Sequence, residues 1–273
     1  MNVNAELSSI FNSLKSRNVQ VQEEASNKLF QYLQKHGEET DNIFEMFAKQ
    51  LQSQKKEDKL GCFTAMNKIL KLSRETSIIH YVNKILPVMR QQMVTNDTAL
   101  VEKGAECLGN LAEMGGAITA QANDETLAQA IKWLRDDTNP KSNKIEKYSA
   151  VLLLREYARK LPIITFNKLF DGDAYRRVFD ACRDHRENVR MTAAECINHC
   201  IRQITERNTR KGHSNQTKLI YDEVENALKS DSDPFYQHSA LSILVAIIQA
   251  RDISKDILKV SKRHKSLIVI VVE

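Results

Sequence analysis

The sequence predicts an all-α protein in which helical hairpins stack into an α-solenoid. Apolar residues recur at three- and four-residue spacing almost throughout, and period-two alternation is essentially absent before the last seven residues. Aromatic residues are only 6% of the chain, with 8 glycines and 4 prolines, which disfavours an all-β fold because strands and turns rely on these residues. The 273 residues are 42% hydrophobic, enough to bury a substantial core.

The helices are predicted in pairs, and the second helix of each pair carries a small residue near its start. These small residues follow one another at intervals of 43, 45, 44 and 46 residues: Gly61, Gly104, Ser149, Ala193 and Ser239. A period of about 40–47 residues with two helices per unit is typical of HEAT and armadillo repeats. The fold class is therefore an α-solenoid of HEAT/armadillo-like helical hairpin repeats.

This period divides the chain into seven segments. Residues 19–33 are expected to form the inner helix of a short first unit, and residues 150–161 and 240–249 are apolar enough to be contacted from two sides. We expect an atypical first helical repeat at 1–36, HEAT repeats at 37–75, 76–117, 118–162 and 163–206, a basic loop and HEAT repeat at 207–250, and an incomplete repeat with an atypical apolar tail at 251–273.

Polar turns that often carry aspartate precede several of the predicted helices, at 95–97, 136–140, 183–188 and 231–234. Asp and Asn accept hydrogen bonds from unpaired backbone N–H groups at helix starts. Pro140 and Pro234 stand where a helix can begin without losing a hydrogen bond. Asp184 and Arg190 are expected to form polar contacts between neighbouring repeats, as in the usual HEAT turn.

Two related stretches, residues 104–116 and 193–200, raise the question of a chemical site. Cys196, His199 and Cys200 have a spacing that could hold a metal, with Cys182 as a fourth ligand. These positions fall on an apolar stripe, however, and Cys107 takes the place of Cys196 in its own repeat without a nearby histidine. We therefore interpret the cysteines as core residues and predict no metal site.

The glycines of the first stretch match no phosphate-binding motif. Gly104 and Gly109 are interpreted as close helix–helix contacts, and Gly115–Gly116 as a helix stop. Residues 184–188 resemble a kinase catalytic loop only in composition, and no nucleophile motif is present. The sequence thus predicts no catalytic or cofactor-binding residue and no cofactor.

Residues 205–216 are polar and basic and are predicted to form an extended loop. The candidate contacts for an anion or an acidic partner are Arg202, Arg207, Arg210 and Lys211. A solvated loop without a ligand is the alternative interpretation. The net charge of +5 is mild and does not indicate a nucleic-acid-binding protein.

The five cysteines form no CxxC pair, and the N-terminal residues do not have the pattern of a signal peptide. We therefore expect free thiols in a reducing compartment, and a cytoplasmic protein, with peripheral endomembrane association or a nuclear location left open. The apolar run at 267–272 is far too short to cross a membrane, and we expect it to promote self-association.

Five segments in order resemble the N-terminal HEAT region of target-of-rapamycin (TOR) kinases: residues 59–70, 96–116, 130–134, 148–162 and 179–197. The resemblance spans roughly residues 20–250. Members of that family are longer and continue into further HEAT repeats, a FAT region, a rapamycin-binding domain and a serine/threonine kinase domain. The resemblance implies that this chain is a short form, a fragment or a truncated gene model of such a protein.

The resemblance further implies a non-catalytic scaffold that contacts Raptor-like or Rictor-like subunits and takes part in TOR self-association. One alternative is an unrelated HEAT or armadillo adaptor, or an importin-like transport protein, which binds a peptide or cargo. A second alternative is an enzyme whose site the sequence does not reveal.

Overall fold

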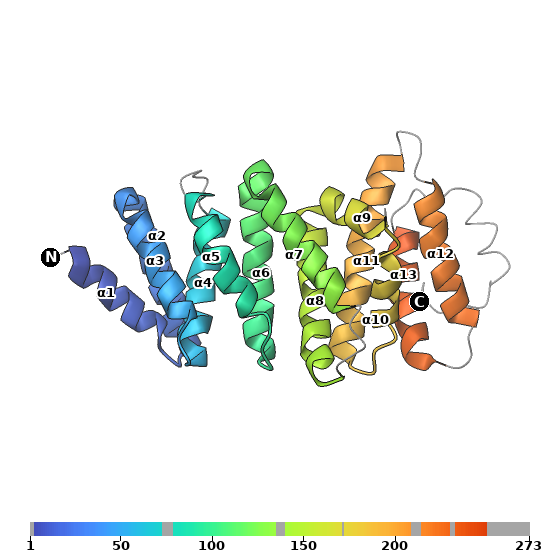
Figure 1. Cartoon of the computed structure of the whole chain (residues 1–273), viewed down its shortest axis with the longest axis horizontal. Helices are drawn as coiled ribbons and strands as arrows, with labels where there is room; N and C mark the ends of the chain where they lie inside the picture. The colour runs from blue at the N-terminus through green and yellow to red at the C-terminus, as the bar shows by residue number, and fades with distance from the viewer. Residues whose placement is uncertain are drawn as a thin grey trace. The chain divides into compact units, whose positions relative to one another are not determined.

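The computed structural model describes residues 3–72, 79–134, 140–170, 172–208, 214–229 and 233–249. Within these ranges the chain forms helices and turns and no strand, which confirms the predicted all-α class (Figure 1). The chain separates into two compact units, residues 1–161 and 162–273. None of the described helices is both long enough and apolar enough to cross a membrane.

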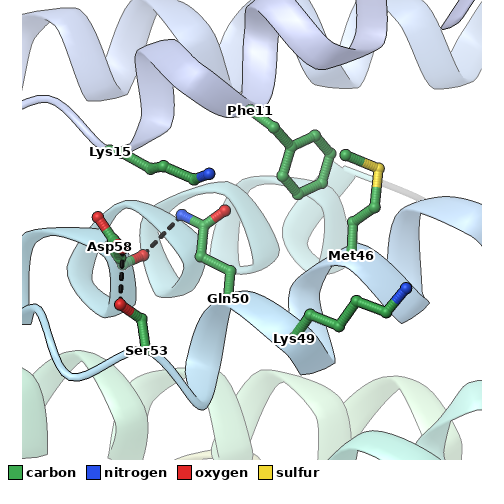
Figure 2. Close-up of a pocket in the computed structure, with 7 residues that line it drawn as sticks. All are labelled: Phe11, Lys15, Met46, Lys49, Gln50, Ser53 and Asp58. Atoms are coloured by element: carbon green, nitrogen blue, oxygen red, sulfur yellow. Dashed lines mark hydrogen bonds between the residues drawn. The ribbon is translucent and has the colours of Figure 1, made fainter.

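The first unit consists of four consecutive helical hairpins. Its helices are α1 (Val3–Leu14), α2 (Val19–Lys35), α3 (Thr40–Leu51), α4 (Lys56–Leu72), α5 (Ile79–Gln91), α6 (Thr98–Gly115), α7 (Ala120–Trp133) and α8 (Pro140–Lys160). The second helices, α2, α4, α6 and α8, pack against one another in that order, and each also packs on the first helix of its own hairpin. The ends of α1 and α3 and the start of α4 surround a pocket (Figure 2).

The second unit contains α9 (Pro162–Phe170), α10 (Tyr175–Ala181), α11 (Glu187–Asn208), α12 (Ser214–Lys229) and α13 (Pro234–Gln249). Here α11 packs against α9, α10 and α13, and α12 packs against α13. The prediction of an extended loop over 205–216 was wrong at both ends, because α11 continues to Asn208 and α12 begins at Ser214. Residues 205–208 contain no glycine or proline, so their composition allows the helix to continue through them.

Three small residues near the start of their helices meet carbonyl groups at or just after the end of an earlier helix: Gly61, Ser149 and Ser239. A Cβ atom on Gly61 of α4 would lie 1.8 Å from the carbonyl oxygen of Leu14, the last residue of α1. The Ser149 hydroxyl of α8 donates to the carbonyl of Met93, just after α5. The Ser239 hydroxyl of α13 donates to the carbonyl of Cys182, at the end of α10, over 3.0 Å.

Gly61, Ser149 and Ser239 thus serve one packing role, whereas a Cβ on Gly104 would meet the Met93 sulfur and the Phe63 ring. In each case the carbonyl belongs to the hairpin before the one that carries the small residue. The last carbonyls of a helix have no partner within it, so a serine hydroxyl satisfies one of them, whereas glycine leaves room for close approach.

Several predicted helix ends are confirmed. The Asp97 carboxylate accepts a 3.1 Å hydrogen bond from the Leu100 amide at the start of α6. Asp233 accepts two such bonds at the start of α13, from the amides of Phe235 and Tyr236. Helix α6 ends at Gly115, and the following Gly116 has a φ of +50°, a left-handed conformation that glycine adopts readily.

Candidate protein-interaction face

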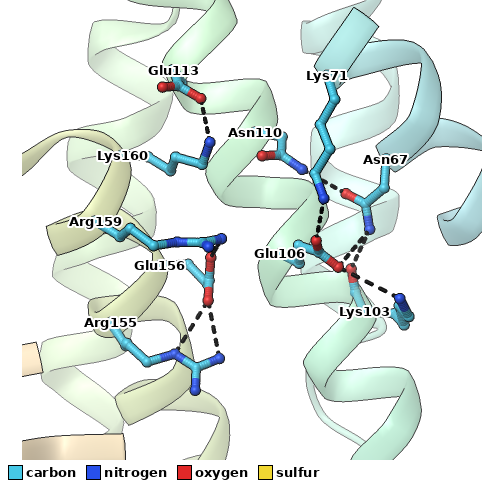
Figure 3. Close-up of polar contacts among 10 residues, drawn as sticks. All are labelled: Asn67, Lys71, Lys103, Glu106, Asn110, Glu113, Arg155, Glu156, Arg159 and Lys160. Atoms are coloured by element: carbon cyan, nitrogen blue, oxygen red, sulfur yellow. Dashed lines mark hydrogen bonds and ion pairs between the residues drawn. The ribbon is translucent and has the colours of Figure 1, made fainter. Parts of the chain in front are cut away.

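The second helices of the first unit carry polar side chains at equivalent positions. Asn67, Asn110 and Arg155 each follow the small residue of their helix, Gly61, Gly104 or Ser149, by six positions. Figure 3 shows these side chains, with neighbouring lysines, arginines and glutamates, along α4, α6 and α8. We call this set the second-helix face; its members are Asn67, Lys71, Lys103, Glu106, Asn110, Glu113, Arg155, Glu156, Arg159 and Lys160.

Asn67 and Asn110 link α4 to α6. The Asn110 amide donates a 2.9 Å hydrogen bond from Nδ2 to Oδ1 of Asn67. Nδ2 of Asn67 in turn lies 3.3 Å from both the Lys103 carbonyl and a Glu106 carboxylate oxygen. Because Asn67 is 5% exposed and Asn110 only 2%, these bonds are shielded from water and fix the register of the two helices.

Glu106 is the centre of the charged contacts between α4 and α6. Its carboxylate lies 2.6 Å from Nζ of Lys71 and 3.7 Å from Nζ of Lys103. Burial opposes ionisation of this carboxyl, but the hydrogen bond from Lys71 and the two lysine charges outweigh it and lower the pKa of Glu106. The group is therefore a stable anion between two cations.

Glu156 is a buried carboxylate on α8, with 4% of the residue exposed. It pairs with Arg155 at 3.0 Å and with Arg159 one turn later. The absence of a side chain at Gly109 of α6 makes room for it, because a Cβ there would come within 3.1 Å of the Glu156 Cβ. The arginines compensate a charge that would be costly to bury alone.

The second-helix face therefore presents cationic groups held in place by carboxylates. Lys71 and Lys103 each expose 49% of their side chains, and Arg159 exposes 44%. Ordered cations of this kind suit recognition of acidic groups on a partner. None of these residues was predicted as a contact from the sequence, although the constant offset of Asn67, Asn110 and Arg155 from the small residues is a signal that could have revealed the face.

The cysteines considered for a metal site lie in the core of the second unit. Cys182, Cys196 and Cys200 are all 0% exposed, and all five cysteines of the chain are free. Burial raises the pKa of the Cys62, Cys107 and Cys182 thiols, so these thiols stay protonated. Within the ranges that the structure describes, no group of three His, Cys, Asp or Glu side chains has an arrangement that could hold a metal ion.

Two of the four candidate basic residues lie within the described part of the chain. Arg202 is exposed on α11, and Arg207 belongs to the same helix. Arg210 and Lys211 lie outside the described residues, as do residues 267–272 of the apolar tail.

The polar contacts of the turn at 183–188 are partly local. Asp184 pairs with Arg186 within the turn, with contacts of 2.9 and 3.0 Å. Arg190 donates to the His185 carbonyl and lies over the ring of Phe235, 4.7 Å from its centroid. Arg190 thereby connects the start of α11 to the start of α13.

Solved structures share the fold. The karyopherin Kap95p, from a structural study of its binding to RanGDP, matches 97% of this chain over 33% of its own length. The TM-score is 0.64 and the sequence identity is 14%. The karyopherin Kap121p matches 92% of the chain over 30% of its own length, with a TM-score of 0.55 and 13% identity. No known protein-family profile matches the chain.

Curated relatives are TOR kinases. Serine/threonine-protein kinase tor1 of Schizosaccharomyces pombe is 21% identical over 85% of this chain, and mTor of Drosophila melanogaster is 25% identical over 81%. TOR of Arabidopsis thaliana is 24% identical over 62%. The match spans only 10%, 9% and 7% of these relatives, respectively, and does not cover a kinase domain. The chain is therefore homologous to the N-terminal helical-repeat region of the TOR kinases.

Proposed function

We propose that this chain is a non-catalytic helical-repeat scaffold that binds a protein partner within a TOR signalling assembly. The observation that carries the proposal is the similarity to TOR kinases over 85% and 81% of the chain. The second-helix face supports it, because this face consists of ordered side chains with exposed cationic ends rather than a cleft around a reactive group.

The partners proposed from this homology are Raptor-like or Rictor-like subunits and a TOR chain itself. The matched part of these relatives does not cover a kinase domain, so the role proposed for the matched region is binding. A cytoplasmic location, with peripheral association to endomembranes, goes with this role. Arg202, Arg207, Arg210 and Lys211 remain a proposed second contact, for an anion or an acidic partner surface.

Affinity capture of the tagged full chain from a native lysate tests the proposal. We expect mass spectrometry to identify Raptor-like or Rictor-like subunits, and Lys103→Glu on the second-helix face to reduce their recovery. Lys28→Glu is the matched control, because Lys28 is exposed on α2 and outside the second-helix face. Failure to recover any TOR-complex subunit with the parent chain would contradict the proposal.

A transport role is the second candidate, and the likeness of the fold to the karyopherin Kap95p favours it. Purified Ran loaded with GTP or GDP separates the two functions. A transport protein is expected to bind one nucleotide form of Ran in preference to the other, whereas a TOR-type scaffold is expected to bind neither form.

A further inference from the structure

A pocket of about 290 Å³ lies where the ends of α1 and α3 meet the start of α4. Its lining residues all precede those of the second-helix face in the sequence, and the two sets share no residue (Figure 2). Its lining residues are Phe11, Lys15, Met46, Lys49, Gln50, Ser53 and Asp58.

Gln50 is the polar group at the base of this pocket. Its Nε2 donates a 2.7 Å hydrogen bond to the Asp58 carbonyl, which fixes the amide. The residue is 6% exposed, and its Oε1 accepts no hydrogen bond from any described residue. In Figure 2 the amide faces the side of the pocket formed by Lys15 and Phe11. A buried acceptor without a donor is unfavourable, so a ligand N–H that reaches it would be bound favourably.

The rim of the pocket is cationic. Lys15 and Lys49 are exposed, and neither forms an ion pair with a carboxylate of the described residues. The one carboxylate of the lining, that of Asp58, accepts a 2.7 Å hydrogen bond from the Ser53 hydroxyl. The lining therefore carries two lysine charges and one carboxylate, a net positive charge, beside a neutral acceptor.

Phe11 and Met46 supply the apolar wall. Phe11 is buried in α1, and Met46 is half-buried on α3. Figure 2 shows the methionine side chain beside the phenylalanine ring. A flexible thioether against a ring can adapt to an apolar side chain of a ligand.

We propose that this pocket binds an acidic segment of a protein partner. A backbone N–H of the segment donates to Oε1 of Gln50 once the exposed Lys15 side chain moves aside. Carboxylates of the segment pair with Lys15 and Lys49, and an apolar side chain contacts Phe11 and Met46. A volume of about 290 Å³ suits one or two side chains of a peptide.

A phosphate group fits the pocket less well than a peptide. The oxygens of a fully ionised phosphate are acceptors only and cannot satisfy Oε1 of Gln50, and phosphate makes no apolar contact with Phe11 and Met46. This inference deepens the proposed function, since it rests on the chain being a scaffold for proteins, and it names the chemistry of one partner segment.

Fluorescence anisotropy with the purified full chain tests the inference. The probe is a fluorescein-labelled peptide of sequence Gly-Asp-Leu-Glu-Asp-Gly, and the control peptide has Asn and Gln in place of its acids. We expect binding of the acidic probe only, weakened by added salt. Lys15→Glu and Lys49→Glu should each weaken it by about tenfold, since each replaces an attraction by a repulsion. Lys28→Glu should leave it unchanged.

A third variant tests the amide. Gln50→Leu removes Oε1, and we expect it to weaken probe binding by at least about fivefold, with thermal unfolding measured to show that the variant is folded. Lys15→Glu and Lys49→Glu alter exposed side chains, so they test the pocket even where Gln50→Leu fails to fold.

Three results would overturn the inference: no binding of the acidic probe at millimolar concentration, equal binding by the parent and both lysine variants, or competition by inorganic phosphate but not by the unlabelled peptide. None of these bears on recovery of TOR-complex subunits by affinity capture. The proposed function and the peptide pocket can therefore fail separately.

Discussion

The side-chain amide of Asn110 donates a 2.9 Å hydrogen bond to the side-chain oxygen of Asn67, 43 residues earlier in the chain. The separation equals that of Gly61 and Gly104, so the two asparagines occupy the same position in successive hairpins. A buried bond between equivalent positions makes the register of α4 and α6 specific, because a shift along either helix would break it and leave the Asn110 amide group without its acceptor.

We expect Asn67→Ala to destabilise the protein by about 1–3 kcal/mol, because it leaves the buried Asn110 amide without its acceptor. A double-mutant cycle with Asn110→Ala, measured by urea unfolding, should give a coupling energy of at least about 0.5 kcal/mol. Asn42→Ala is the control, since Asn42 is exposed. Strictly additive effects of the two substitutions would show that the bond does not stabilise the fold.

Gly61→Ala is expected to destabilise the first unit by roughly 1–3 kcal/mol or more, because overpacking forces the backbone to move. The added Cβ would stand 1.8 Å from the Leu14 carbonyl oxygen, a rigid main-chain atom. Gly37→Ala is the matched control, because a Cβ there would meet nothing within 4 Å. Equal denaturation midpoints for the two variants would contradict the close approach of α4 to the end of α1.

Stability should fall in acid through Asp97 and Glu106. Burial raises the pKa of each carboxyl, but other contacts outweigh this effect, so both have a lowered pKa in the fold. For Asp97 these contacts are hydrogen bonds from Lys56 and from the Leu100 amide. For Glu106 they are the hydrogen bond and the charge of Lys71. Their stabilising contribution is therefore present above the ordinary values of 3.8 and 4.5, and it is lost as pH falls through the lowered pKa of each group.

Urea unfolding between pH 7 and pH 3 measures this loss. The Lys56→Met and Lys71→Met variants should each show a shallower decline in the free energy of unfolding than the parent. Lys28→Met should decline as the parent does, since Lys28 is exposed on another helix, α2. Parallel declines for all four proteins would exclude the two lysine contacts as the cause.

The cysteines should react slowly with iodoacetamide in the native protein, because all five are buried and burial raises the pKa of the Cys62, Cys107 and Cys182 thiols. Unfolding in urea should make all five reactive, as intact mass spectrometry would show. Rapid labelling of Cys196 or Cys200 before unfolding would contradict their placement in the core.

The sequence by itself determined the fold class and much of the local structure. Helical spacing of apolar residues predicts the helices, and recurring small residues predict their pairing. The aspartates at 97 and 233 and the two glycines at 115 and 116 predict helix ends, because capping depends on neighbours within a few residues. The prediction of an extended loop over 205–216 was wrong because polar, basic composition indicates exposure and does not by itself end a helix.

Only the tertiary structure decided what the small residues and the polar positions contact. Ser149 and Gly61 are both small residues in the sequence pattern. In the structure the Ser149 hydroxyl donates to a carbonyl, whereas Gly61 leaves room for one. Glu156 is buried because Gly109 of another hairpin leaves room for it, and Gln50 lines a pocket because α1 ends beside α3. Such facts depend on residues far apart in the chain. Helical periodicity describes one helix at a time, whereas these contacts arise from how the helices stack.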